Sequence, residues 1–436
     1  MQILPSRGDT EQIVALAPDW WGAVDIILPP LSIRGKADLL AGYERLSPAS
    51  SSSSLSIAGG IPRSQPGATD VAIWLLNMAM TVHNLPSGRK DTRFEDPNRL
   101  QAFPNLVSQT VEARILANDE LASTISGLEC ALLLVRLRLN LGRARNAWLC
   151  LRRAISVAET VSLARCVGGL DRQSESKPRR QPVEEQDMAS SRLGASIWLG
   201  LSFIDKFLST LVNLPTITYG RVPTLPACLT RGYPARATFW SLSEIAGGIA
   251  MRDQLADVQV GRAGSGEQTA ALARKLQELR DAYADEEWLM PYTGTQPSMV
   301  CRPVPILAQY CFYYLQFCCY LPTMLRTKEG GPGASRESRD ICLASCRALA
   351  ERYILPSKAP ASDFLAIRMI DFVAFTAAVM LALYSVSGVS GLCRSIPNSR
   401  QKFTGSPRAD NVQPQPHRPD VTGPNPTTPT LSLIHI

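Results

Sequence analysis

Histidine is scarce in this sequence. The 436 residues contain three histidines, His83, His417 and His435. Because histidine is the side chain that most often acts as a general base near neutral pH, the composition leaves little material for hydrolytic or group-transfer chemistry. The G-x-S-x-G nucleophile elbow, the phosphate-binding G-x-x-x-x-G-K-[ST] loop and the H-E-x-x-H metal pair are also absent from the sequence. We therefore expect no catalytic residues and no enzyme, and we interpret His83, which follows an apolar segment, as a helix-capping or surface residue.

Charge is also sparse, and its sign is nearly balanced. Asp, Glu, Lys and Arg make up 19% of the chain, with a formal net charge of +7. A nucleic-acid-binding domain usually concentrates Lys and Arg on one face, whereas here they are interleaved with acids along the chain. The one dense group comprises Arg136, Arg138, Arg143, Arg145, Arg152 and Arg153. We interpret these arginines as solvent faces of two amphipathic helices, with a contact to phosphate or to a partner's acidic face as the alternative.

Cysteine pairs at C-x-x-C spacing are missing, although eleven cysteines occur. A tetrahedral zinc site draws neighbouring thiolates from such spacing, but Cys318 and Cys319 are adjacent, and Cys342 and Cys346 are one helical turn apart. The second pair could hold half a site, with packing in an apolar helix as our interpretation. The cysteines are scattered through apolar segments, where a cysteine usually packs as a small hydrophobic residue in a reducing compartment. We therefore expect buried free thiols, no disulfide framework, and no metal or other cofactor bound by this chain.

Two long segments contain no charged residue. They cover residues 303–325 and 372–393, and each is long enough to cross a bilayer. An integral membrane protein with spans at these two segments is therefore one alternative. The first segment, however, contains three prolines and two glutamines, and the second is rich in Ala, Ser, Thr and Gly, features that disfavour insertion. We expect both segments to form buried core helices.

Apolar residues recur with a helical period through most of the chain. Between residues 127 and 165 they form two such runs, separated by a stop at Asn140 and Gly142. This pattern predicts an antiparallel helical hairpin. The alternation typical of strands is hard to find, and its best candidate, residues 216–222, ends in a loop punctuated by proline. The predicted fold class is all-α, a large multi-helix bundle with disordered loops and a disordered C-terminal tail.

Polar interruptions define the expected organisation. Residues 1–46 form the N-terminal part of a helical domain, and residues 47–69, with a serine run followed by Gly and Pro, form a flexible loop. Residues 70–393 form the main helical domain, interrupted at 168–188 by a polar insertion that we expect to be disordered. Residues 394–436 are rich in proline and are expected to be a disordered tail. Its last six residues, LSLIHI, read like the translation of a transposon end used in sequencing libraries, so we interpret them as an artefact.

Four segments share their type and order with the signatures of one protein family. The first is the helical pair at 128–165, whose second helix contains Trp148 and the run AISVA at 154–158. The second is RLGASIWLGLSFIDKFLSTLVNLP at 192–215, the third is ILAQYCFYYLQFCCYLPTMLR, and the fourth is SRDICLASCRALAERY followed by DFVAFTAAVMLAL. Together they resemble the fungal-specific transcription factor domain, the middle homology region of the binuclear zinc-cluster regulators. The second signature falls on Arg192, Trp198, Asp205, Lys206, Ser209 and Pro215.

The resemblance implies a function and a set of partners. It implies a nuclear regulator of RNA polymerase II transcription, in which residues 70–393 are the regulatory domain. Sequence-specific DNA contacts and zinc would belong to a separate six-cysteine module, normally N-terminal; no stretch of this chain holds six cysteines within forty residues. A homodimer, transcriptional co-regulators and a small-molecule inducer are the partners it suggests, and a stand-alone small-molecule-sensing helical domain is a further alternative. Since an Asp within an apolar helix must be paired, we expect Asp205 to accept bonds from an Arg or from backbone donors.

Overall fold

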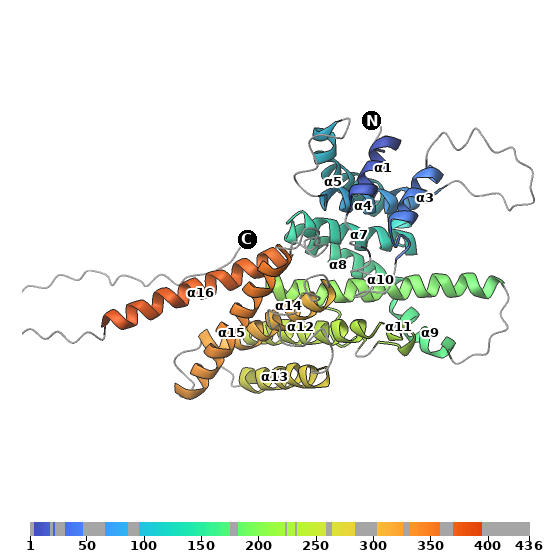
Figure 1. The fold of residues 1–436 in the computed structure, drawn as a ribbon. Coiled ribbons are helices and arrows are strands. Elements are labelled where there is room, and N and C mark those ends of the chain that lie inside the picture. Colours follow the sequence, from blue (N-terminus) through green and yellow to red (C-terminus); the bar gives the residue numbers. More distant parts are fainter. Residues whose placement is uncertain are drawn as a thin grey trace, which may run out of the picture. The chain divides into compact units, whose positions relative to one another are not determined.

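The structure, a computed structural model, is all-helical. It describes residues 4–17, 21, 31–46, 66–85, 96–174, 182–222, 225–231, 233–258, 264–283, 303–325, 332–357 and 369–394. Within these residues there are fifteen α-helices and no strand, which confirms the predicted fold class (Figure 1). The contacts divide the chain into two units, Met1–Val386 and Ser387–Ile436, and of the second unit only the end of the last helix is described.

Local capping contacts mark where the first helices begin. They are α1 (Arg7–Leu16), α3 (Lys36–Leu46), α4 (Ala68–His83) and α5 (Pro97–Val111), which continues into the π-helical turn η3 (Glu112–Leu116) and the short α6 (Asp119–Ala122). The side chain of Asp96 accepts a hydrogen bond from the N–H of Arg99, and Pro97 takes the first helical position, where no N–H is needed. His83 is the last residue of α4, as its position after an apolar segment suggested.

The predicted hairpin is present as α7 (Ile125–Asn140) and α8 (Ala144–Thr160). Thr124 caps α7 through the N–H of Gly127, and Gly142 turns the chain with a φ of 74°. That left-handed conformation suits glycine, so the stop predicted at this position is confirmed. Gly127 itself has no room for a side chain, because an added Cβ would lie 1.9 Å from the carbonyl oxygen of Leu121.

The polar insertion predicted at 168–188 is shorter in the structure. Helix α9 (Ala164–Ser174) runs into its first part, and α10 (Pro182–Val212) begins before its end. Leu170 is buried against the same core as Val167, so one face of α9 is apolar enough to pack. Only residues 175–181 lie outside the described residues. The expectation of disorder across the whole segment was therefore wrong for both of its ends.

The second half of the chain continues with α11 (Ala227–Thr230), α12 (Pro234–Val258), α13 (Gly264–Ala282), α14 (Pro303–Leu325), α15 (Pro332–Ser357) and α16 (Met369–Arg394). Helix α10 contacts α7, α8 and α9 as well as α12, and Figure 1 shows it between the α7–α8 hairpin and α12. Helices α14 and α15 pack along one another, and α12 contacts both α13 and α14. Helix α10 is thus the element shared by the two halves.

Two clusters of buried side chains follow from this arrangement. The N-terminal core gathers apolar residues of α1, α3, α4, α5 and α7 to α10. The C-terminal core gathers those of α12 to α16, together with Phe207 of α10. Phe203 and Leu211, also on α10, pack against both clusters. A helix that is apolar on more than one face is required at such a position, and α10 satisfies this requirement.

The two uncharged segments have different environments. Residues 303–325 coincide with α14, whose Ile306, Ala308 and Leu315 are buried in the C-terminal core, as predicted. Residues 372–393 lie in α16, which buries Val373 and Ala377 in the C-terminal core but leaves Phe375 68% exposed, so the expected core helix is buried on one face and exposed on another. Among the described helices, one stretch, Met188–Val212, is long and apolar enough to cross a membrane, and 78% of its most apolar part is buried.

Most of the described cysteines behave as small buried residues. Cys130, Cys150, Cys319, Cys342 and Cys346 are buried free thiols, as expected, whereas Cys228 is exposed on α11. Burial raises the pKa of the Cys150, Cys319 and Cys346 thiols to about 11. The thiol forms therefore predominate at neutral pH. The expected tail at 394–436, apart from its first residue, and most of the loop at 47–69 lie outside the described residues.

Candidate functional site

Asp205 holds the loop that follows α10. Its Oδ2 accepts hydrogen bonds from the hydroxyls of Thr216 (2.7 Å) and Thr218 (2.8 Å), and from the backbone N–H groups of Ile217 and Thr218 (both 3.0 Å). The carboxylate is fully buried. The prediction that this Asp accepts bonds from backbone donors is confirmed. Four donors converge on one buried oxygen, so the conformation of the loop and the burial of the carboxylate depend on one another.

The loop begins where α10 ends. Asn213 adopts a left-handed φ of 51°, a conformation that Asn tolerates at a helix C-terminus. The Ser209 hydroxyl then donates to the carbonyl of Pro215 (3.0 Å), which fixes the reversal of the chain. Pro215 therefore ends the signature segment by turning Thr216 and Thr218 back toward Asp205. The best strand candidate of the sequence, residues 216–222, is this loop.

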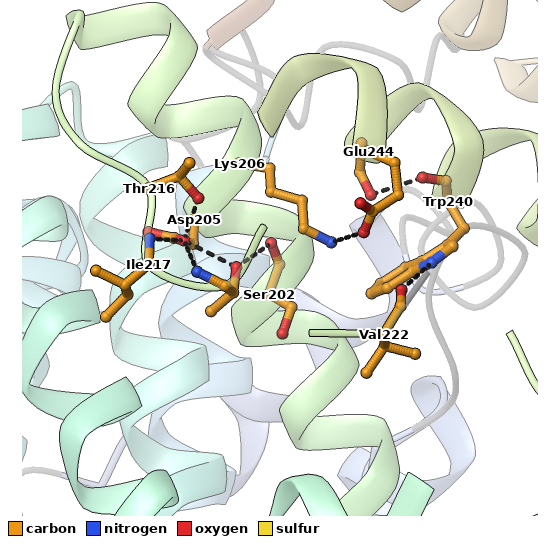
Figure 2. A network of polar contacts seen from close by, with 10 residues as sticks. Ser202, Asp205, Lys206, Thr216, Ile217, Val222, Trp240 and Glu244 are labelled. Atoms are coloured by element: carbon orange, nitrogen blue, oxygen red, sulfur yellow. Dashed lines mark hydrogen bonds and ion pairs between the residues drawn. The ribbon is translucent and has the colours of Figure 1, made fainter. Parts of the chain in front are cut away.

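Lys206 points away from Asp205, toward α12. Figure 2 shows Asp205 facing Thr216 and Ile217 while Lys206 extends to Glu244. The Lys206 ammonium also lies 4.0 Å from the ring centre of Trp240, whose indole N–H donates to the carbonyl of Val222 (3.0 Å). Burial lowers the pKa of Lys206, and the carboxylate of Glu244 opposes that shift. The pair joins α10 to α12 by a charged contact and a cation–π contact.

Close backbone approach completes the α10–α12 contact. The Thr210 hydroxyl donates to the carbonyl of Ala246 (2.7 Å). A Cβ on Gly247 would lie 2.7 Å from the Tyr219 ring, and a Cβ on Gly248 would meet the Leu272 side chain at the same distance. These two glycines leave room for Tyr219, so the loop after Asp205 packs onto α12.

Arg152 approaches Asp205 from α8. Its Nη1 lies 3.8 Å from Asp205 Oδ1, and its guanidinium lies 4.7 Å from the ring centre of Trp148, one turn earlier. Burial lowers the pKa of Arg152, and Asp205 opposes the shift. Among the described residues, Arg152 Nε and Nη2, Trp148 Nε1 and Asp205 Oδ1 are buried atoms with no hydrogen-bond partner. Two donors on one guanidinium edge, an indole donor and a carboxylate acceptor are therefore grouped at the α8–α10 junction.

The structure brings together five of the seven residues singled out in the sequence. They lie in or beside one network, which we call the α10 network, and they are Trp148, Asp205, Lys206, Ser209 and Pro215. Trp198 is buried in the N-terminal core on the same helix, and its indole nitrogen has no hydrogen-bond partner among the described residues. Arg192 is exposed on α10, well before Asp205. The roles that the resemblance suggests for these residues remain predictions.

The sequence alone missed Arg152 as a member of the network. The arginine group at 136–153 was interpreted as solvent-exposed, but the Arg138 side chain is 7% exposed and pairs with Glu112, and the Arg152 side chain is 17% exposed. The available signal was the four-residue spacing between Trp148 and Arg152, which places both on one helix face. Arg143, Arg145 and Arg153 are exposed, as expected.

The C-terminal core contains a different buried arginine. Arg252 of α12 donates through Nη1 to the carbonyl of Cys319 (2.7 Å) and the hydroxyl of Thr269 (3.2 Å), and through Nη2 to the carbonyl of Cys318 (3.0 Å). Pro322 has no N–H, so the carbonyl four residues earlier, at Cys318, lacks its usual helical donor. Arg252 therefore satisfies the carbonyl that Pro322 frees inside α14.

The described residues hold no evident metal site. No group of three His, Cys, Asp or Glu side chains lies close enough to bind an ion in this part of the chain. The site is a network that links helices through charged and polar contacts, with unused hydrogen-bond donors at the α8–α10 junction.

Curated relatives of this chain carry names from gene regulation. The chain is similar to fungal transcription regulators. It is 25% identical over 281 residues (62% of this chain, 34% of the relative) to a dehydrocurvularin biosynthesis regulator of Alternaria cinerariae. It is 25% identical over 333 residues (73% and 43%) to a regulator of the same name from Aspergillus terreus. It is 28% identical over 155 residues (36% and 19%) to the transcription factor sdnS of Sordaria araneosa.

The extent of these similarities is limited. The chain spans less than half the length of the curated relatives it matches. No family model matches the chain, and no solved structure matches it. The relatives therefore support a regulatory role in transcription and suggest a fungal transcription factor.

Proposed function

We propose that this chain is the regulatory domain of a fungal transcription factor that acts in the nucleus on RNA polymerase II transcription. The observation that carries the proposal is the similarity over 73% of the chain to a protein named as a regulator of biosynthesis. The all-helical fold is the one that the resemblance to the middle homology region implies. In this proposal, zinc and sequence-specific DNA contacts belong to a six-cysteine module outside these 436 residues.

The α10 network supports a regulatory rather than a catalytic role. Asp205 contacts Arg152 of α8 and accepts hydrogen bonds from the 216–218 loop, and Lys206 donates to Glu244 of α12. The charged groups of α10 therefore connect α8, α10 and α12. A domain that passes a signal between bound partners needs elements in contact with both halves, and α10 contacts both cores. Co-regulators and a second copy of the chain are the protein partners that we propose.

A reporter experiment tests the regulatory role. The full chain is fused to a heterologous DNA-binding domain and expressed in a fungal host with a reporter gene downstream of the matching operator. We expect reporter expression to change relative to the DNA-binding domain alone, and not when the operator is mutated. An accumulated, nuclear fusion that leaves expression unchanged would contradict the proposal.

Transcript sequencing tests the proposed DNA-binding module. Reads that extend upstream of the codon for Met1 are translated in frame and examined for six cysteines at binuclear-cluster spacing. Such a frame supports the proposal as stated. Transcripts that start without it would refute direct DNA binding and leave the chain as a co-regulator that is recruited by another protein.

A further inference from the structure

At the α8–α10 junction, several buried polar atoms have no hydrogen-bond partner in the part of the chain that the structure describes. Arg152 Nε and Nη2 form one edge of the guanidinium, and neither has a hydrogen-bond partner among the described residues. The indole N–H of Trp148, whose ring lies against that guanidinium, is unpartnered as well. A buried donor left without an acceptor costs about 1–3 kcal/mol, so three such donors at one place call for an acceptor.

The geometry of the donors indicates the chemistry of that acceptor. Two parallel N–H groups on one guanidinium edge match the two oxygens of a carboxylate. Asp205 holds Arg152 by its other side, through Nη1, so the Nε–Nη2 edge stays available while the guanidinium is fixed. The negative charge of Asp205 lies close by, which disfavours a dianion such as phosphate more than a monoanion.

We propose that the Nε–Nη2 edge of Arg152 and the indole N–H of Trp148 bind the carboxylate of a small organic acid at the α8–α10 junction. The unpartnered Oδ1 of the fully buried Asp205 accepts a hydrogen bond from a hydroxyl or amine on the same molecule. Trp148 is only half-buried and Ile217 is 37% exposed, so a residue in contact with Arg152 and a residue bonded to Asp205 both reach the surface.

The position of this site links it to regulation. Asp205 anchors the 216–218 loop, and the next residue, Lys206, contacts Glu244 of α12. A ligand that draws Arg152 or Asp205 toward itself therefore acts on the contact between α10 and α12. This regulatory consequence rests on the proposed function, whereas binding of the acid does not.

Binding to the purified full chain tests the site directly. Benzoate serves as the probe, with benzamide as its neutral isostere, acetate as a smaller carboxylate and inorganic phosphate as a dianion. Calorimetric titration up to about 10 mM detects dissociation constants into the millimolar range. We expect benzoate and acetate to bind and to raise the melting temperature, and benzamide and phosphate to bind more weakly.

Matched variants locate the binding. Arg152→Lys keeps the positive charge but loses the two parallel N–H groups of the guanidinium edge, and it should weaken benzoate binding about tenfold. Trp148→Phe keeps the ring and removes the donor, so it should weaken binding by a smaller factor. Arg153→Lys, at the next position on the exposed face of α8, is the control and should bind as the wild type does.

Several results would overturn the proposal. They are the absence of benzoate binding to the folded wild-type chain, equal binding of benzamide, tighter binding of phosphate, or equal weakening by Arg152→Lys and Arg153→Lys. If Arg152→Lys fails to fold, the Trp148→Phe titration decides in its place, and unchanged affinity there counts against the site. None of these measurements involves transcription, so failure of the site and failure of the proposed function are distinguishable.

Discussion

Arg152 and Arg252 are both arginines in apolar surroundings, yet their donors are used differently. Arg252 has polar partners for Nε, Nη1 and Nη2, including two carbonyls of α14 and the carboxylate of Asp253. Arg152 has a single charged contact, at 3.8 Å from Asp205, and two unpartnered nitrogens among the described residues. The first arrangement is a completed structural contact, and the second keeps hydrogen-bonding capacity for something else.

The two arginines differ in which neighbouring group requires a hydrogen-bond donor. Near Arg252 a backbone carbonyl requires a donor, because Pro322 leaves the carbonyl of Cys318 without its helical N–H inside a buried helix. Near Arg152, the Oδ2 of Asp205 already accepts four hydrogen bonds from the 216–218 loop, and only Oδ1 faces the guanidinium, at 3.8 Å, which is too long for a hydrogen bond. An arginine with two buried nitrogens that form no hydrogen bond within the described residues is a candidate for a role in binding.

The largest effect should come from removing the carboxylate that Arg152 faces. Asp205→Ala deletes the acceptor of four hydrogen bonds and leaves the N–H groups of Ile217 and Thr218 without it. We expect the free energy of unfolding to fall by about 4 kcal/mol, measured by urea denaturation. Ser209→Ala, which loses only the bond to Pro215, should cost about 1 kcal/mol. Equal losses in the two variants would refute the anchoring role of Asp205.

The next largest effect should come from Arg252. Arg252→Met leaves the carbonyls of Cys318 and Cys319 without their side-chain donor, and we expect a loss of about 3 kcal/mol in unfolding free energy. Pro322→Ala restores the helical N–H that Cys318 lacks. In a double-mutant cycle the Arg252→Met loss should therefore shrink by about 1 kcal/mol in the Pro322→Ala background. Strict additivity would show that Arg252 does not compensate for the proline.

Arg152→Met should have a much smaller effect on stability. Asp205 keeps its hydroxyl and backbone donors, and the variant removes two buried donors that have no partner. Because the contact that is lost is a 3.8 Å ion pair and not a hydrogen bond, we expect the unfolding free energy to change by less than about 1 kcal/mol in the absence of ligand. A loss as large as that of Arg252→Met would erase the distinction between the two arginines.

The smallest effect concerns pH and the buried Glu129 of α7. Within the described part of the chain, its two oxygens accept hydrogen bonds from the backbone N–H of Ser32 (2.8 Å) and from the Ser32 hydroxyl (2.6 Å), and burial raises the pKa of Glu129 above the usual range. The folded state therefore holds the Glu129 proton more tightly than the unfolded state does. As pH rises through the raised pKa, the wild type should lose stability relative to Glu129→Gln, in melting temperatures measured from acid to neutral pH. A difference that is constant with pH would contradict this.

Sequence by itself determined the fold class and much of the local structure. Apolar residues at helical spacing specified the α7–α8 hairpin, and Asn140 with Gly142 marked its turn, because these signals act within a few neighbouring residues. The expectation that Asp205 is paired also held, since an isolated charge inside an apolar helix is too costly. The same local logic held for only one face of α16, where uncharged composition indicated burial but Phe375 is exposed.

Only the tertiary structure decided which residues meet. The network takes its charged side chains from three helices, through Arg152, Asp205 and Glu244. No spacing along the chain predicts that α10 lies between α8 and α12. The pairing of Arg252 with the carbonyl freed by Pro322 depends in the same way on how α12 crosses α14. Helix periodicity fixes which side of each helix is apolar, whereas partners across the core depend on the packing of whole helices, which local residues do not encode.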